Sequence, residues 1–225
     1  MGFTTIGQSA EGRPIVCFSR SGERPHWVLV VAAMHGDEPK GVHVARNLIE
    51  ALSAPAANQP GGLNWAVIPV ANPDGFEHRK RRNAHRVDLN RNFPTNNWEP
   101  GSKRSRMYGG SSPASEPETR VVMRLIQRIR PRAIVTIHSI GLNRFCNNYD
   151  GPARRLAALM ARHNGYPIMA TIGYPTPGSF GTWAGRELAI PTITLELPSH
   201  ASNRQCWDDN REALLSALPA FLRSR

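Results

Sequence analysis

The stretch Trp27–Ala33 constrains the fold of this chain most strongly, because it holds seven apolar residues in an uninterrupted row. Its valines favour a strand, and the absence of polar alternation predicts that this strand is buried on both faces. Apolar residues then recur at helical spacing between Val42 and Leu52, and Pro39 stands where a first helical turn tolerates proline. A buried strand followed by an amphipathic helix is typical of α/β proteins.

The alternation of strand and helix continues to the end of the chain. Ala133–Ile137 is another β-branched run, and Pro131 before it ends a helix with apolar side chains at helical spacing. Ser115 and Glu118 match a capping box at the start of that helix. The other expected elements are strands at 14–18, 65–70 and 192–197, helices within 151–163 and over 208–222, and turns at 6–9 and 72–75.

This order of elements predicts the fold class. Strands that alternate with helices favour a sheet covered on both faces, because each helix returns the chain for another parallel strand. We therefore expect an α/β fold, a three-layer α/β/α sandwich with a central mixed, largely parallel sheet. A length of 225 residues suits one sizeable domain and is short for two, so we expect a single domain over 1–225.

The composition also predicts a location. No uninterrupted apolar stretch approaches the roughly 20 residues of a membrane span, so we expect no membrane partner. The N-terminal residues lack the basic segment and apolar core of a secretory signal, which predicts a cytoplasmic protein. Cys17, Cys146 and Cys206 are odd in number and widely spaced, which argues against both a disulfide framework and a cysteine-based zinc site.

The net charge of the chain limits the classes of molecule that we expect it to bind. The chain has 28 lysine and arginine residues against 17 acidic ones, a formal net charge of +11. Such an excess fits an anionic substrate, a nucleic acid or a solvated basic surface. The basic residues cluster at Arg79–Arg82, but no helix-turn-helix, zinc-finger or aromatic RNA-binding motif accompanies them. We expect a small anionic substrate and no nucleic-acid partner.

Polar side chains follow two of the expected strands. His35 and Glu38 come just after Trp27–Ala33, and His138 comes directly after Ala133–Ile137. The carboxyl ends of parallel strands meet at one edge of a sheet, and zinc accepts imidazole nitrogen and carboxylate oxygen. We interpret the three residues as zinc ligands with one position open for water. The alternative is a surface turn at a helix N-terminus and a histidine bonded to a carbonyl.

Glu196 stands inside the apolar strand expected at 192–197. A buried carboxylate needs a partner or a function, because an unpaired charge is costly to bury. We interpret Glu196 as a general base that takes a proton from zinc-activated water. The alternative is a carboxylate at a strand end that is paired with an arginine.

The segment Arg81–Pro94 carries little hydrophobic periodicity and alternates Asn, Asp and Arg with Val and Leu. Long irregular segments in compact domains are uncommon and often functional. The pair Asn90 and Arg91 suits forked recognition of a carboxylate, and further arginines suit the stabilisation of developing oxyanion charge. The alternative is an exposed basic loop, but such a loop would not need Asn, Asp and Arg to alternate with Val and Leu.

Taken in chain order, these motifs resemble the zinc carboxypeptidase family, and the resemblance spans nearly the whole chain. The matching segments are the Gly-x-Ser-x-Glu-Gly-Arg-Pro-Ile opening at 7–15, His35-x-x-Glu38, Arg81-x-Asn83, Val87–Phe93, Ile137–Ser139 and Leu195–Leu197. Within the family, the short length and three further segments are most similar to the bacterial murein peptide amidase branch. These segments are 92–98, 109–119 and 173–183.

The resemblance implies that residues 1–225 form one catalytic domain with one zinc ion per chain. His35, Glu38 and His138 would bind the zinc, and Asp88 would hydrogen-bond the far nitrogen of His35. Glu196 would be the base that then protonates the departing amine.

The resemblance also implies how the substrate is held. Arg81 would polarise the scissile carbonyl, with Arg79 and Arg82 as the alternatives if the register differs. Asn90 and Arg91 would hold the terminal carboxylate of the substrate.

The amidase branch implies a cytoplasmic hydrolase of murein peptides that cleaves the C-terminal γ-D-glutamyl–meso-diaminopimelate bond. We expect a monomer or homodimer, between which the sequence does not decide. Three alternatives stay open. They are a general or D,L-specific metallocarboxypeptidase, a deacylase of the succinylglutamate desuccinylase and aspartoacylase type, and a basic non-catalytic binding protein. The run from Asn90 to Pro94 favours the peptidase over the deacylase.

Two departures from the family pattern affect the predicted site. Digestive members have a mobile tyrosine ahead of the catalytic glutamate, but the stretch Ser179–Ala184 has none, so we expect an assisting hydroxyl from elsewhere. The segment Ile140–Asp150 is not typical of the amidase branch. Because this segment would line the pocket for the departing residue, the sequence leaves the preferred side chain open.

Overall fold

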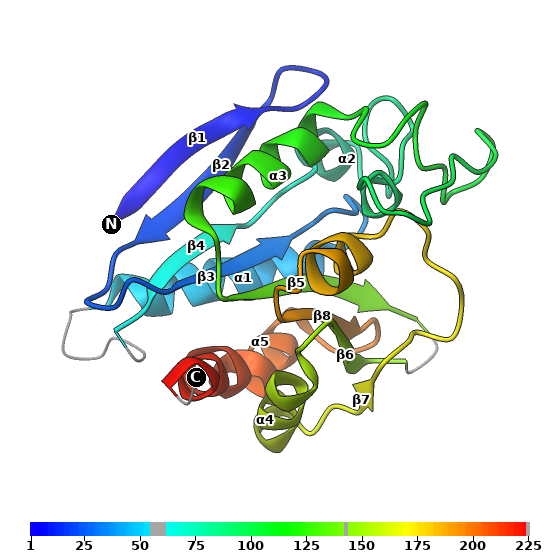
Figure 1. Cartoon of the computed structure of the whole chain (residues 1–225). Coiled ribbons are helices and arrows are strands. Elements are labelled where there is room, and N and C mark those ends of the chain that lie inside the picture. Colours follow the sequence, from blue (N-terminus) through cyan, green and yellow to red (C-terminus); the bar gives the residue numbers. More distant parts are fainter. Residues whose placement is uncertain (55–61, 142–143, 224–225) are drawn as a thin grey trace.

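The computed structural model describes residues 1–54, 62–141 and 144–223 (Figure 1). The strands are β1 (Gly2–Gln8), β2 (Pro14–Arg20), β3 (Trp27–Ala32), β4 (Asn64–Ile68), β5 (Ala133–Ile140), β6 (Cys146–Asp150), β7 (Ile168–Met169) and β8 (Thr192–Pro198). The α-helices are α1 (Pro39–Ser53), α2 (Pro73–Glu77), α3 (Pro117–Ile129), α4 (Arg154–Asn164), α5 (Asn203–Glu212) and α6 (Leu218–Arg223).

All of these strands join one sheet, in the order β1–β2–β4–β3–β5–β8–β6–β7. The four central strands β4, β3, β5 and β8 are parallel to one another. β1 and β2 add an antiparallel edge on one side, and β6 pairs antiparallel with β8 on the other. The predicted mixed, largely parallel sheet is therefore confirmed.

Helices cover both faces of the sheet, as Figure 1 shows. Residues of β3 divide between two cores: Val28 and Val30 pack with α1, α4, α5 and α6, whereas Leu29 and Val31 pack with α3. Because successive side chains of a strand point to opposite faces, an uninterrupted apolar run serves both cores. This arrangement is the predicted α/β/α sandwich.

Several local predictions were wrong at the edges of the fold. Residues 6–9 belong mostly to β1, where a turn was expected, because this edge strand is largely exposed and lacks a buried apolar pattern. β6 was not predicted, since its sequence Cys-Asn-Asn-Tyr-Asp is mostly polar. The last helical region begins at Asn203, earlier than 208, with the Ser202 side chain as its N-terminal cap. The turn at 72–75 is the start of α2, capped by Asn72.

The predicted capping box of α3 does not form. The N-cap residue is Glu116, and no side chain caps the helix there. Ser115 Oγ donates instead to the Glu116 carboxylate at 2.7 Å, and Glu118 accepts the backbone N–H of Ala10 at 3.0 Å. The two side chains that would form the capping box therefore bond to other groups.

Most of the surface connection predicted after α1 and part of the segment 140–150 lie outside the described residues. Within the described part of the chain, no helix combines the length and apolarity needed to cross a lipid bilayer.

Candidate active site

His35 and Glu38 lie on the turn between β3 and α1. Ala33 begins this turn with a left-handed φ of 49°, so the chain leaves the sheet sharply. The side chain of Asn72 donates to the Met34 carbonyl at 3.2 Å and braces the turn. Gly36 lies directly against the backbone of Gly75, where a Cβ would collide. The turn is therefore held tightly from the neighbouring loop.

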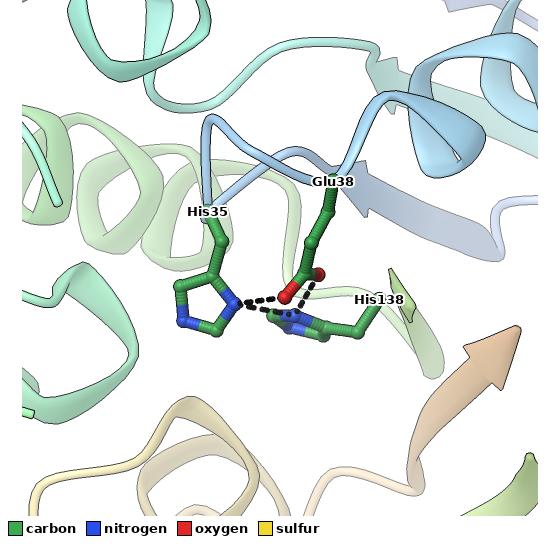
Figure 2. A group of neighbouring side chains, drawn as sticks. All are labelled: His35, Glu38 and His138. Carbon is green, nitrogen blue, oxygen red and sulfur yellow. Dashed lines mark hydrogen bonds and ion pairs between the residues drawn. The ribbon is translucent and has the colours of Figure 1, made fainter. Parts of the chain in front are cut away.

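His138 completes a cluster of three buried side chains with His35 and Glu38 (Figure 2). It lies within β5, which runs three residues further than the predicted strand Ala133–Ile137. The two histidine Nδ1 atoms are 3.1 Å apart. Glu38 Oε1 lies 2.7 Å from His35 Nδ1, and Glu38 Oε2 lies 3.0 Å from His138 Nδ1. The structure thus brings together the three residues that the sequence predicted as ligands.

The donor set and its spacing fit a zinc ion. Two nitrogen ligands at about 2.0–2.1 Å from a tetrahedral zinc stand about 3.3 Å apart, close to the spacing of the two histidine nitrogens. Imidazole and carboxylate groups are ligands that zinc prefers, and three protein ligands leave a fourth position open. In the described ranges, no other three histidine, cysteine or acidic side chains converge in this way.

Asp88 supports the cluster from behind. Its Oδ1 atom lies 2.9 Å from Nε2 of His35, the nitrogen that faces away from Glu38. The predicted contact between Asp88 and the far nitrogen of His35 is therefore present. Such a contact fixes the ring orientation of a histidine that binds metal through its other nitrogen. Asp88 is fully buried, and it also accepts the N–H of Asn90 at 3.0 Å at the start of a 3₁₀ turn, Leu89–Arg91.

The charges of the cluster shift one another's pKa values. Burial disfavours the imidazolium of His35, but the carboxylates of Glu38 and Asp88 outweigh it and raise the pKa of His35 to about 9. Burial alone would raise the pKa of Glu38, but the neighbouring histidines hold it well below its usual range. In the absence of metal, His35 therefore holds a proton at neutral pH.

Glu196 lies beside His138, its register partner on β8. The residue is 7% exposed and lines the same cavity as the cluster. Burial raises the pKa of its carboxyl. Within the described part of the chain, no hydrogen bond or ion pair reaches this carboxylate, so the alternative of a structural pair with an arginine has no support.

Arg81 is the arginine of its cluster that reaches the candidate site. Nε and Nη2 of Arg81 donate to Asp88 Oδ2 at 3.1 and 2.9 Å, and Nη1 lies 3.5 Å from Glu38 Oε1. Arg82 donates instead to the Ser105 carbonyl at 3.1 Å. Arg79 lines a separate surface hollow. Of the three arginines considered, Arg81 alone lines the cavity with His35.

Asn90 and Arg91 form another wall of this cavity. Oδ1 of Asn90 accepts the backbone N–H of Phe180 at 2.9 Å. Arg91 is 2% exposed, Nη2 lies 3.7 Å from Met107 Sδ, and Nε is buried without a hydrogen-bond partner among the described residues. Burial lowers the pKa of its guanidinium. A buried guanidinium with unused donor capacity suits an anionic ligand.

The structure places one tyrosine on the cavity wall, Tyr174, which the sequence prediction missed. Tyr174 lies five positions before Ser179, outside the stretch Ser179–Ala184 in which the family resemblance leads one to expect a tyrosine. Tyr174 is 38% exposed and follows Gly173, whose φ is 88°. A tyrosine within a Gly- and Pro-rich loop just ahead of that stretch was the available signal. Asn148 and Asp150, from the segment expected to line the pocket for the departing residue, also lie on the cavity wall, together with Ser179 and Arg186.

Comparisons with known proteins agree with this arrangement. Residues 1–150 match the model of the zinc carboxypeptidase family. Murein peptide amidase A from Escherichia coli K12 is 32% identical over 228 residues, covering 96% of this chain and 88% of that protein. Murein peptide amidase A from Vibrio campbellii is 33% identical over 207 residues, covering 87% of this chain and 79% of that protein.

Solved structures extend the comparison to the fold. The crystal structure of murein-tripeptide amidase from Escherichia coli O157 has a TM-score of 0.77 and 30% identity, covering 99% of this chain and 92% of that one. Carboxypeptidase A from Helicoverpa armigera has a TM-score of 0.82 at 22% identity, covering 98% of this chain and 69% of that one, and this likeness shows the fold alone. This chain belongs to the zinc carboxypeptidase family, a family of peptide-bond hydrolases.

Proposed function

We propose that this protein is a zinc-dependent amidase that removes the C-terminal residue of murein peptides at the γ-D-glutamyl–meso-diaminopimelate bond. The observation that carries the proposal is the convergence of the His35–Glu38–His138 cluster and Glu196 on one cavity. The substrate follows from similarity to murein peptide amidases over 96% of the chain.

His35, Glu38 and His138 would hold one zinc ion per chain, with Asp88 fixing the ring of His35. When bound, the zinc would polarise a water molecule and the carbonyl group of the scissile bond. Glu196 would take the proton from the attacking water and pass it to the departing amine. Because Glu196 is buried and has no other partner among the described residues, its carboxylate is available for this transfer.

The wall of the cavity would position the substrate. Asn90 and Arg91 would bind the terminal carboxylate, since the Arg91 guanidinium is buried with an unused donor. Arg81 would stabilise the negative charge that develops on the carbonyl oxygen, with Asp88 setting its orientation. Tyr174 would supply the hydroxyl that assists at the cavity mouth, the group for which no residue had been predicted.

The remaining features fit this substrate class. Murein peptides carry several carboxylates, and a net charge of +11 attracts such molecules to a basic cleft. The three cysteines are buried and unpaired, which fits the reducing cytoplasm where we place the enzyme. We further propose that it acts as a monomer or homodimer, without nucleic-acid or membrane partners.

The decisive experiment offers purified, zinc-loaded protein murein tripeptide, ordinary L-peptides and N-acyl amino acids, and identifies the products by mass spectrometry. We expect diaminopimelate to be released from the tripeptide. Release only from L-peptides would favour a general carboxypeptidase, and deacylation alone would favour the deacylase. No turnover of any substrate by zinc-loaded protein would favour the non-catalytic binding protein.

A further inference from the structure

A row of polar residues leads away from Glu196 along the cavity. β6 pairs antiparallel with β8, so that Cys146 lies opposite Glu196, Asn148 opposite Thr194 and Asp150 opposite Thr192. Alternate residues of a strand share a face, so Asn148 and Asp150 point to the same side as Cys146. Asn148, Asp150, Thr194 and Glu196 all line the cavity.

Asp150 places a buried carboxylate in this row. The residue is 6% exposed, and its Oδ1 accepts from Nε of Arg186 at 2.7 Å. The side chain of Arg186 is 56% exposed and also lines the cavity. One end of the cavity therefore presents a fixed negative charge beside an accessible positive charge.

Two further observations concern the placement of the Asp150 carboxylate and unused bonding capacity in the same row. A Cβ at Gly181 would collide with Oδ2 of Asp150, so only glycine at this position lets the carboxylate lie where it does. The side-chain oxygen of Asn148 is buried without a hydrogen-bond partner among the described residues. Buried polar groups without partners are uncommon in proteins and require an explanation.

We propose that Asp150 and Arg186 bind the side chain of the released residue and select one that ends in both an ammonium and a carboxylate group. Asp150 would bind the ammonium group, and the accessible guanidinium of Arg186 would bind the carboxylate. This inference rests on the proposed function, and it answers the question of side-chain preference that the sequence left open.

The spacing along the strands requires a long side chain. Asp150 lies four positions after Cys146, which is opposite Glu196, and this is a distance of about 13 Å along the strand at the usual rise. Glu196 would protonate the departing amine, so the released residue must extend from there toward Asp150. The side chain of diaminopimelate is long and ends in an amino-carboxylate centre, and short side chains would not reach.

The electrostatics of Asp150 support a cationic ligand. Burial raises the pKa of the Asp150 carboxyl, and the single contact with Arg186 does not reverse this. A second positive charge near the carboxylate would stabilise its ionised form. If the pair served only to hold β6 against the segment 181–187, the side chain of Arg186 would not need to stay exposed at the cavity.

The test compares peptides that differ only in the released residue: meso-diaminopimelate, lysine, 2-aminopimelate or norleucine. The side chain of diaminopimelate ends in both an ammonium and a carboxylate group. Lysine has the ammonium group alone, 2-aminopimelate has the carboxylate group alone, and norleucine has neither. We expect kcat/KM to be highest for diaminopimelate and lowest for 2-aminopimelate, whose carboxylate lies beside Asp150 without an ammonium group.

Two variants assign the charges to residues. Asp150→Asn should lower kcat/KM for the diaminopimelate and lysine peptides by ~10- to 100-fold, which is the effect expected from losing one hydrogen bond to a charged group. The same variant should change kcat/KM for the norleucine peptide by less than ~3-fold, because that side chain makes no such hydrogen bond. Arg186→Gln should lower kcat/KM for diaminopimelate to about the level of lysine and leave lysine unchanged. Arg204→Gln is the matched control, because Arg204 also pairs with a carboxylate but is 90% exposed and does not line the cavity.

The outcomes separate this inference from the proposed function. If wild type cleaves the peptides and both variants keep its preference among the four residues, the pocket assignment is wrong even though the amidase stands. If wild type cleaves none of them, the proposed function fails first. Thermal melting shows whether each variant is folded. If Asp150→Asn is unstable, the ratio of kcat/KM for diaminopimelate to kcat/KM for lysine in Arg186→Gln tests the pocket assignment instead.

Discussion

His138 and Glu196 lie side by side in register on the parallel strands β5 and β8, and both line one cavity. The sheet therefore sets the position of the proposed base relative to a proposed metal ligand through backbone pairing. Rigid strands hold reacting groups more accurately than loops do.

The His35–Glu38–His138 cluster should bind zinc in a ratio of one ion per chain. Replacing His35 or His138 with alanine removes one of three protein ligands, so both variants should lose bound zinc. His43→Ala is the control, since His43 lies on α1 and, among the described residues, its ring bonds only to the side chain of Asn47. Metal content after dialysis is measured by atomic absorption, and full zinc occupancy in both cluster variants would contradict the site.

Glu196→Gln should keep zinc but lower kcat by ~10²- to 10⁴-fold, the usual contribution of one proton-transfer group. The amide has nearly the same shape as the carboxylate but cannot accept the proton. Glu50→Gln on the exposed face of α1 provides the matched control. Steady-state kinetics on murein tripeptide, combined with metal analysis, checks this, and near-normal turnover would exclude Glu196 from the mechanism.

Asp88→Asn should weaken zinc binding by about 10- to 100-fold, because it removes the charge that orients His35. The variant should also free Arg81, whose Nε and Nη2 both donate to Asp88. A competition titration with a zinc chelator measures the affinity. An unchanged affinity would show that Asp88 only shapes its loop.

Arg91→Ala should raise KM chiefly for substrates with a free C-terminal carboxylate, because the lost guanidinium no longer pairs with that group. Peptides with an amidated C-terminus serve as the comparison within the same assay. Arg120→Ala is a suitable control, because the side chain of this exposed arginine donates to the carbonyls of Ala114 and Ser115 and to no other group in the described part of the chain. Equal losses on free and amidated peptides would argue against a carboxylate clamp.

The pKa of His35, raised to about 9 in the absence of metal, predicts a pH dependence of stability. The proton on His35 stabilises the metal-free fold fully below its ordinary pKa near 6.5, and this contribution is lost as the pH rises through about 9. Glu38 and Asp88 have lowered pKa values, so their contribution is present above about pH 4 and is lost as the pH falls.

Metal-free protein should therefore melt at a lower temperature at pH 9.5 than at pH 7, while zinc-loaded protein should not, because the metal replaces the proton on His35. Zinc binding at pH 7 should also release about one proton from His35. Calorimetry in buffers of different ionisation enthalpy measures that proton. If the metal-free protein melts at the same temperature at pH 7 and at pH 9.5, the raised pKa of His35 is contradicted.

Much of the fold followed from local patterns. The run at 27–33 and the helical spacing after it predicted β3 and α1 within a residue or two, since burial on both faces leaves an uninterrupted apolar signature. Edge elements gave no such signature: β1 is mostly exposed, and β6 is mostly polar. The capping box of α3 failed because Glu118 bonds to Ala10 instead, a contact between residues 108 positions apart.

The sequence by itself determined the chemistry available to this protein, namely two histidines, two glutamates and a loop of Asp, Asn and Arg, and it placed them next to strands. Tertiary structure alone decided which of these groups meet. It brings Glu38 within 3.0 Å of His138 across 100 residues, places Arg81 and not Arg79 or Arg82 at the cavity, and puts Tyr174 and Asp150 on its wall. The physical reason is that strand order and register are long-range properties, which no local pattern of side chains encodes.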